Sequence, residues 1–214
     1  MAKATRALLA GALSLGLLVG CSGSDAPAPL STGSLACNRD DVPSQFLPLV
    51  TGDFTAGNLA ELAQDRERRA AVLRDAGFVE GSFSYWKETV DRAPFDPPAN
   101  ALCEVLRFET EAGAVAYVRA IDPLRDGDLP GLTWLQARPQ TVVELDDAGP
   151  DRSFELRGAG DDGVRLAALY SVQGEHVLSV YVGGIRPKNE LEQALAIQAR
   201  LLQRVSGLLA TRGR

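Results

Sequence analysis

Apolar residues recur along the chain with two spacings, one typical of strands and one typical of helices. Short apolar or alternating runs predict strands over 79–90, 101–109, 141–146, 153–157, 164–172 and 175–182. Apolar residues three and four positions apart predict helices over 58–77, 110–121 and 189–209. Because hairpins are followed by helices, the pattern predicts the α+β class, an antiparallel sheet with helices packed on it. Residues 35–214 are expected to form a single domain.

The first predicted helix carries signals at both ends and one conflict in the middle. Asn58 and Glu61 have the spacing of a capping box, so the helix is expected to start at Asn58. Gly77 is a typical left-handed residue at a helix end. Arg66 projects onto the middle of the apolar face. We therefore expect the helix to break near Asp65, the alternative being an arginine stem that lies across the edge of the core.

The last two strands form a predicted hairpin whose register follows from side-chain parity. In each strand the even-numbered residues are the more apolar set. A three-residue connection that ends in Gly174 at positive φ would place both sets on one face, with Tyr170 opposite His176. A two-residue turn at residues 173–174 would instead pair Tyr170 with Val177 and put the second set on the opposite face. We expect the first arrangement, with the even residues against the helices.

The N-terminus carries the features of a bacterial secretion signal. Lys3 and Arg6 precede an apolar stretch over 7–18, which is too short to span a bilayer of about 30 Å. The stretch runs into the tetrapeptide LVGC at residues 18–21, which resembles the lipobox of bacterial lipoproteins, whose cysteine is diacylated and becomes the mature N-terminus. A short buried helix that contains a chance cysteine is the alternative.

The lipobox resemblance implies a signal peptide over residues 1–20 and a lipid anchor on Cys21. Residues 21–34 are rich in Ser, Pro, Ala and Gly, so they are expected to form a flexible tether that reaches roughly 40 Å when extended. Two acyl chains would hold the protein stably on a membrane. The expected location is therefore extracytoplasmic, lipid-anchored to a bacterial membrane.

Three cysteines are present, and acylation of Cys21 would leave an even pair, Cys37 and Cys103. An exported protein meets an environment in which disulfides persist, so we expect these two cysteines to pair. A metal site or a catalytic thiol is the alternative, and either would need suitably spaced histidines or carboxylates. The single histidine, His176, lies far along the chain, and no metal site is predicted.

Composition and charge exclude one class of partner. The chain is 45% hydrophobic and 23% charged, which is typical of a folded globular protein. Its formal charge of −6 becomes −8 when residues 1–20 are removed, because Lys3 and Arg6 are lost. Without a basic stripe, such a chain is not expected to bind nucleic acid.

Two loop patterns resemble ligand motifs but lack the expected surroundings. Residues 158–163 match G-x-G-x-x-G, yet a strand rather than a helix is predicted after them, so we interpret them as a hairpin loop that binds no cofactor. Two acidic clusters lack the spacing of a twelve-residue calcium loop and are expected to be solvated loops. Their residues are Asp122, Asp126, Asp128, Asp146, Asp147 and Asp151.

The layout of strands and helices resembles the sheet-and-helix modules of small exported lipoproteins, including the Mog1/PsbP-like kind. The segments DVP at residues 41–43 and AGF at residues 76–78 are similar to segments of uncharacterised lipoproteins of high-GC bacteria. The resemblance would cover most of residues 36–209. It implies no particular functional residue.

Motifs of nucleophilic or zinc-dependent hydrolases are missing from the sequence, which contains neither G-x-S-x-G nor H-E-x-x-H. Five aromatic residues are candidates for lining a ligand groove, although the aromatics of a small sheet more often belong to its core. They are Phe83, Tyr85, Trp86, Trp134 and Tyr170.

Two functions remain as hypotheses. The first is a non-catalytic, membrane-anchored envelope module that binds an envelope protein or an apolar ligand. An apolar pocket lined by the aromatics would favour a ligand, and a solid core would favour a protein partner. The alternative is an envelope hydrolase that uses two converging carboxylates, one of which has a raised pKa.

Overall fold

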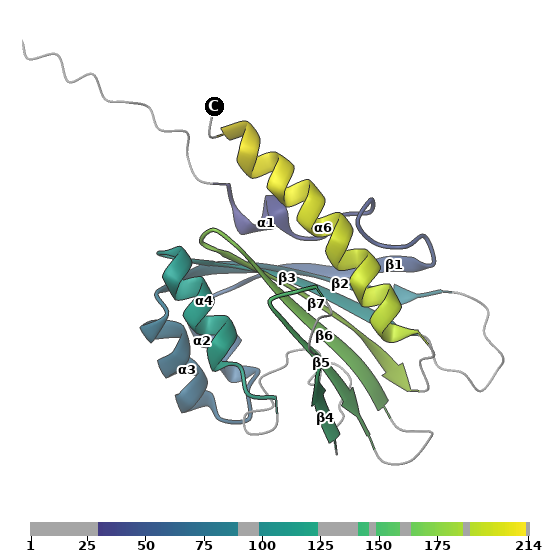
Figure 1. The fold of residues 1–214 in the computed structure, drawn as a ribbon, viewed down its shortest axis with the longest axis horizontal. Helices are drawn as coiled ribbons and strands as arrows, with labels where there is room; N and C mark the ends of the chain where they lie inside the picture. The colour runs from purple at the N-terminus through teal and green to yellow at the C-terminus, as the bar shows by residue number, and fades with distance from the viewer. Residues whose placement is uncertain are drawn as a thin grey trace, which may run out of the picture.

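In the described part of the chain, seven strands pair side by side into one antiparallel sheet, and helices lie on both of its faces (Figure 1). The computed structural model describes residues 30–89, 99–123, 141–145, 149–158, 164–185 and 189–212. The strand order is β1-β2-β3-β7-β6-β5-β4. The predicted α+β class is therefore confirmed. The strands are β1 Phe46–Phe54, β2 Phe78–Glu88, β3 Asn100–Phe108, β4 Thr141–Glu144, β5 Arg152–Arg157, β6 Val164–Gln173 and β7 His176–Ile185.

The helices divide between the two faces of the sheet (Figure 1). The helices α1 and α6 cover one face, and α2, α3 and α4 cover the other, so that each face buries its own apolar cluster. The central strand β3 is consequently buried along nearly its whole length. No helix in the described part of the chain has the length and apolar character needed to cross a membrane. The helices are α1 Thr32–Leu35, α2 Ala56–Glu61, α3 Arg66–Asp75, α4 Glu111–Ala120 and α6 Glu190–Arg212.

The helix expected over 58–77 is in fact two helices, and the predicted break near Asp65 is confirmed. The Asp65 carboxylate accepts a hydrogen bond from the backbone N–H of Arg68 and so caps the start of α3. Arg66 is exposed at this new start instead of lying across the core. The break therefore removes the conflict that Arg66 would cause within one continuous helix.

The helix ends follow local side-chain chemistry, with one difference from the sequence expectation. The N-cap of α2 is Thr55, which forms reciprocal hydrogen bonds with Asn58, so α2 starts before the predicted position. Gly77, just after α3, has a φ of 71°. This is the left-handed conformation expected at a helix end.

The edge strand β1 is not indicated by the sequence pattern, because Pro48 and Gly52 interrupt it. An edge strand needs hydrogen-bonding partners on one side only, so it tolerates a proline. The register of β1 with β2 also shifts between Pro48 and Val50, which marks a bulge at Leu49.

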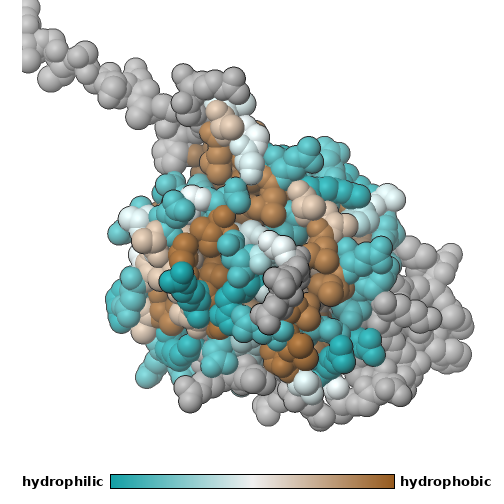
Figure 2. Space-filling view, viewed as in Figure 1, coloured by the Kyte–Doolittle hydropathy of each residue, from teal (hydrophilic) through white to brown (hydrophobic). Residues whose placement is uncertain are grey.

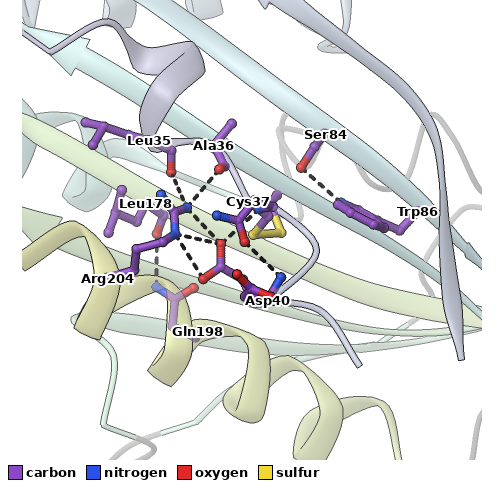
Figure 3. Close-up of a disulfide and its surroundings, with 12 residues drawn as sticks. Leu35, Ala36, Cys37, Asp40, Ser84, Trp86, Leu178, Gln198 and Arg204 are labelled. Carbon is purple, nitrogen blue, oxygen red and sulfur yellow. Dashed lines mark hydrogen bonds and ion pairs between the residues drawn. A yellow bond between two sulfur atoms is a disulfide. The ribbon is translucent and has the colours of Figure 1, made fainter. Parts of the chain in front are cut away.

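The N-terminal segment is fastened to the body by a disulfide and by an arginine of α6 (Figure 3). Cys37 is bonded to Cys103 of β3, with their Cα atoms 5.8 Å apart, which confirms the predicted disulfide. Arg204 pairs with the buried Asp41 at 2.7 Å and donates to two backbone oxygens at the end of α1. The helix α1 is therefore held against the sheet, and residues 32–34 of the segment expected to be a flexible tether are helical.

The register predicted for the C-terminal hairpin is wrong. The strands β6 and β7 join through residues 174–175, so that Tyr170 lies opposite Ser179 and not opposite His176. The even residues of β6 consequently face α2 to α4, whereas the even residues of β7 face α6. The prediction assumed that only one face of the sheet is apolar. It fails because helices cover both faces of the sheet, so each face carries apolar side chains.

The positive φ expected at Gly174 is confirmed at 58°. A Cβ there would meet no atom within 4 Å, so the cost of Gly174→Ala is backbone strain alone. We expect this variant to lower the free energy of unfolding by about 1 kcal/mol in urea denaturation. Gly207→Ala is the matched control, because its Cβ also meets nothing and helix α6 should gain about 0.5–1 kcal/mol. Equal stability of the two variants would contradict the prediction.

Several sequence predictions concern residues outside the described ranges, namely the signal peptide, Cys21, Trp134 and most of the acidic residues. The glycine-rich segment at 158–163 also lies largely outside them. The strands β5 and β6 that flank it pair antiparallel, so a strand follows the glycines, as predicted.

Candidate functional site

Polar and charged side chains form a cluster under α3 and α4, within an otherwise apolar face of the sheet. Glu104 of β3 is 0% exposed, and Arg69 of α3 is 2% exposed. The Glu104 carboxyl group accepts a hydrogen bond of 3.0 Å from the Tyr181 hydroxyl. Arg69 donates to the Tyr117 hydroxyl and lies over its ring, and Tyr170 packs edge-on against Tyr181. We call these five residues the buried polar cluster.

The local folding of each element directs these side chains inward. The restart of the helix at Asp65 sets the phase of α3 so that Arg69 faces the sheet. The pleat of β3 directs Glu104 toward the same layer, because neighbouring strand residues point to opposite faces. The helix α4 approaches the end of α3 closely at Gly113, where a Cβ would overlap the carbonyl oxygen of Ala76.

Burial gives Glu104 an unusual acidity. It raises the pKa of Glu104 from 4.5 to about 7, while the hydrogen bond from Tyr181 and the positive charge of Arg69 act in the opposite direction. Burial also raises the pKa of Tyr170 and of Tyr181 well above the usual range. Within the cluster, Glu104 is therefore the group that exchanges a proton near neutral pH.

Several buried polar atoms in and beside the cluster have no hydrogen-bond partner among the described residues. They include Oε1 of Glu104, the hydroxyl oxygen of Tyr170 and the hydroxyl oxygen of Ser179, which lies directly opposite Glu104 in the β3–β7 pair. A neutral carboxyl group has an O–H donor, whereas a carboxylate only accepts. The protonation state of Glu104 therefore decides which hydrogen bonds Glu104 and Ser179 can form.

A groove of about 410 Å³ lies at the C-terminal end of α4. Arg68 of α3 and Arg119 of α4 contribute to its lining, and the neighbouring strands contribute Glu144, Arg152 and Phe154. Small-molecule sites have volumes of about 300–1,000 Å³, so the groove is large enough for such a ligand. Its lining is mixed, with charged and apolar residues in equal number. We call it the α4 groove.

Two arginines hold the wall of the α4 groove. Arg152 binds both carboxylate oxygens of Glu144 and donates to three backbone oxygens at the end of α4. Arg68 donates to the backbone oxygen of Ala120. A helix end leaves carbonyl groups without intrahelical partners and carries partial negative charge. The two guanidinium groups therefore serve as a cap for α4.

A second groove, of about 340 Å³, lies between α1 and the edge formed by β1 and β2. Its polar lining includes Ser82 and Asp53, and the Ser82 hydroxyl donates to the Asp53 carboxylate. Ser82 also shares a hydrogen bond with Thr32 of α1. These contacts join the N-terminal segment to the sheet, so the groove is better explained as a packing seam than as a ligand site.

Apolar side chains are exposed on the edge strand β1, where Leu49 is 57% exposed and Leu47 and Val50 nearly as much. Pro48 and the bulge interrupt the outer edge of β1, which protects a sheet against pairing with a further strand. Figure 2 shows that apolar side chains also reach the surface elsewhere, between polar ones. Exposure on β1 alone does not identify a docking site.

Among the described aromatic residues predicted as candidate groove lining, Phe83 lines the second groove, whereas Tyr85, Trp86 and Tyr170 line neither groove. Trp86 is buried in the cluster beneath α6, and its Nε1 donates to Ser84 (Figure 3). Tyr170 belongs to the buried polar cluster, and Tyr85 packs partly buried beside it. Trp134 lies outside the described residues. A ligand contact by these aromatics stays a prediction.

His176 opens β7 at the rim of the sheet, as expected, and is buried. Burial lowers the pKa of its imidazole. In the β6–β7 pair it lies opposite Gln173, not opposite Tyr170 as the predicted register required. On its other side, in the β3–β7 pair, it lies opposite Arg107. Among the described residues, no three His, Cys, Asp or Glu side chains are grouped so that they could hold a metal ion.

Sequence reasoning missed Glu104 and Arg69, although each leaves a signal. Glu104 is the single charged residue in the otherwise apolar run over 101–106, and a charge in such a strand is rarely buried without a partner. Arg69 lies four residues before Leu73, hence on the same face of α3. The position of Arg69 on the apolar face can be inferred only when α3 is known to start after Asp65.

These features define an α+β module in which two helical layers enclose a sheet, with a buried polar cluster beneath one layer. The extracellular domain of PknH from Mycobacterium tuberculosis has a similar fold, with a TM-score of 0.53 and 16% sequence identity. The similarity covers 84% of this chain and 98% of that domain, and at this identity it shows a shared fold alone. No protein-family model and no curated protein matches the sequence.

Proposed function

We propose that the protein is an extracytoplasmic binding module, tethered to a bacterial membrane through lipid on Cys21. The observation that carries this proposal is the shared fold with an extracellular domain, because the similarity covers 98% of that domain. The disulfide between Cys37 and Cys103 supports an oxidising compartment. The lipobox-like tetrapeptide at residues 18–21 supports the anchor.

The α4 groove is the contact site that the geometry favours. It has the volume of a ligand site, and the five charged residues among the ten that line it suit a polar ligand or the polar side chains of an envelope protein better than a wholly apolar ligand. The hydrolase alternative needs two converging carboxylates. Asp122 and Glu144 both line the groove, but both oxygens of Glu144 are bound by Arg152. Glu104, with its raised pKa, is fully buried and faces tyrosines and an arginine instead of a second carboxylate.

Location and anchoring are tested by the variant Cys21→Ala in a bacterium that processes lipoproteins. The wild-type protein should enter the detergent phase and carry the mass of a diacylglyceryl group. Cys21→Ala should lack this mass and retain its signal peptide. Cys103→Ala is the control, since it removes a cysteine but should still be lipidated. Absence of the diacylglyceryl mass from the wild-type protein would refute the anchor. The location is tested with a C-terminal alkaline phosphatase fusion, an enzyme that is active only outside the cytoplasm, and an inactive fusion would refute it.

The contact site is tested by placing a photo-crosslinking amino acid at Arg119, which is exposed in the α4 groove. The same amino acid at Arg74, an exposed residue at the other end of the helical layer, is the matched control. A crosslinked product in living cells from position 119 alone supports the groove as the contact site. Products from both positions, or from neither, count against it.

A further inference from the structure

We propose that Glu104 is a proton-binding site through which the pH of the surrounding medium controls how tightly α3 and α4 pack on the sheet. The geometry behind this proposal is the division of the buried polar cluster between layers. Glu104 and Tyr181 belong to the sheet, whereas Arg69 and Tyr117 belong to the helices. The proton linkage goes beyond the proposed function and holds wherever the protein is located.

Every element packed around Glu104 contributes to its surroundings. The strand β2 places Phe83 beside it, and β7 places Ser179 on its other side, and neither of these side chains carries a charge. The positive charge of Arg69 favours the ionised form. The groups of the cluster that carry charge or titrate are Arg69 from α3, Tyr117 from α4, Tyr170 from β6 and Tyr181 from β7.

The neutral and the ionised form of Glu104 differ in the charge and the hydrogen bonds that the core must accommodate. A neutral Glu104 places no negative charge in the core, and its O–H group can donate to a neighbour such as Ser179. An ionised Glu104 must be compensated by the hydrogen bond from Tyr181 and by the positive charge of Arg69. Since a buried charge is costly, the ionised form favours any movement that admits water to the carboxylate.

The sign of the linkage follows from this difference. When α3 and α4 lift from the sheet, Glu104 becomes hydrated and its pKa falls from about 7 toward the ordinary value of 4.5. Opening therefore releases a proton and is favoured as the pH rises. For full hydration, the opening equilibrium constant should increase roughly 40-fold between pH 5 and pH 7.

The same movement reaches the α4 groove. Arg68, which lines the groove, directly precedes Arg69, and Arg119 lies two residues after Tyr117. The close approach at Gly113 ties the start of α4 to the end of α3, so that the two helices are expected to move together. Protonation of Glu104 then holds the groove in the observed shape, and loss of the proton loosens its walls.

The test is amide hydrogen exchange of the full-length protein from pH 5 to pH 8, corrected for the intrinsic pH dependence of exchange. Opening constants for α3 and α4 should rise with pH by more than tenfold. Those for α6, which covers the opposite face, should rise less and so serve as an internal control. In Glu104→Gln, which keeps the side-chain volume and an acceptor for Tyr181, the difference between the two layers should disappear.

A second variant separates the proton switch from a merely structural role. Tyr181→Phe removes the hydrogen bond that favours the ionised form, so the midpoint of the pH dependence should move to higher pH. Carbon-13 NMR of labelled glutamate side chains reports the titration of Glu104 directly. Equal pH dependence of α3, α4 and α6, or an unchanged difference in Glu104→Gln, would overturn the proposal. So would titration of Glu104 at its ordinary pKa.

Discussion

Reduction of the disulfide between Cys37 and Cys103 is expected to lower the free energy of unfolding by about 4 kcal/mol. The physical reason is the long loop, since the two cysteines are 66 residues apart and the cross-link greatly restricts the unfolded chain. The link also joins the N-terminal segment to the central strand β3, so its loss should affect the whole domain and not one end alone.

Urea denaturation with and without a reductant measures this effect, and mass spectrometry establishes that reduction is complete. The double variant Cys37→Ala, Cys103→Ala should resemble the reduced wild type under both conditions. Because Arg204 still binds Asp41 and the end of α1, the reduced protein should retain its fold at low urea. Superimposable curves for the oxidised and the fully reduced protein would refute the prediction.

The stability of the wild type should fall as the pH rises through the window between 4.5 and about 7, because of Glu104. The folded state binds the proton of the Glu104 carboxyl group more tightly than the unfolded state does. The contribution of this proton to stability is therefore complete below pH 4.5 and lost by about pH 7. The difference between these two pKa values corresponds to about 3 kcal/mol. It is a large effect for one side chain.

The variant Glu104→Gln isolates this contribution, since it cannot titrate. Its free energy of unfolding minus that of the wild type should increase by up to about 3 kcal/mol between pH 4 and pH 8, because only the wild type loses stability over this range. His176→Gln is the control in the opposite direction. Burial lowers the pKa of His176, so its contribution to stability is lost as the pH falls below about 6.5. A constant difference between wild type and Glu104→Gln would exclude Glu104 as the source.

Local sequence signals determined much of the secondary structure. The conflict created by Arg66 predicted the break that Asp65 caps, and Gly77 and Gly174 both have the positive φ expected of them. The cysteine count, together with the inferred export, predicted the Cys37–Cys103 pair. The helix break and the two glycine conformations depend on residues close in sequence, and the cysteine pairing depends on a count of cysteines. None of these inferences requires knowledge of which residues are neighbours in space.

Strand pairing and the candidate site depended on partners far apart in the chain. Parity within β6 and β7 could not show that both faces of the sheet are covered, so the predicted pairing of Tyr170 with His176 is wrong. The sequence pattern did not predict the strand β1, because Pro48 argues against a strand in the interior of a sheet. A proline is tolerated in an edge strand, but the edge position of β1 is known only from the assembled sheet.

The sequence by itself determined the α+β class, the helix break and the cysteine pairing, because these follow from local periodicity, capping and composition. The tertiary structure alone decided that Glu104 and Arg69 share one buried cluster, 35 residues apart in the chain. The acidity of Glu104 depends on desolvation by α3, α4 and the neighbouring strands. Desolvation arises only when those elements pack together, and no single segment of sequence contains it.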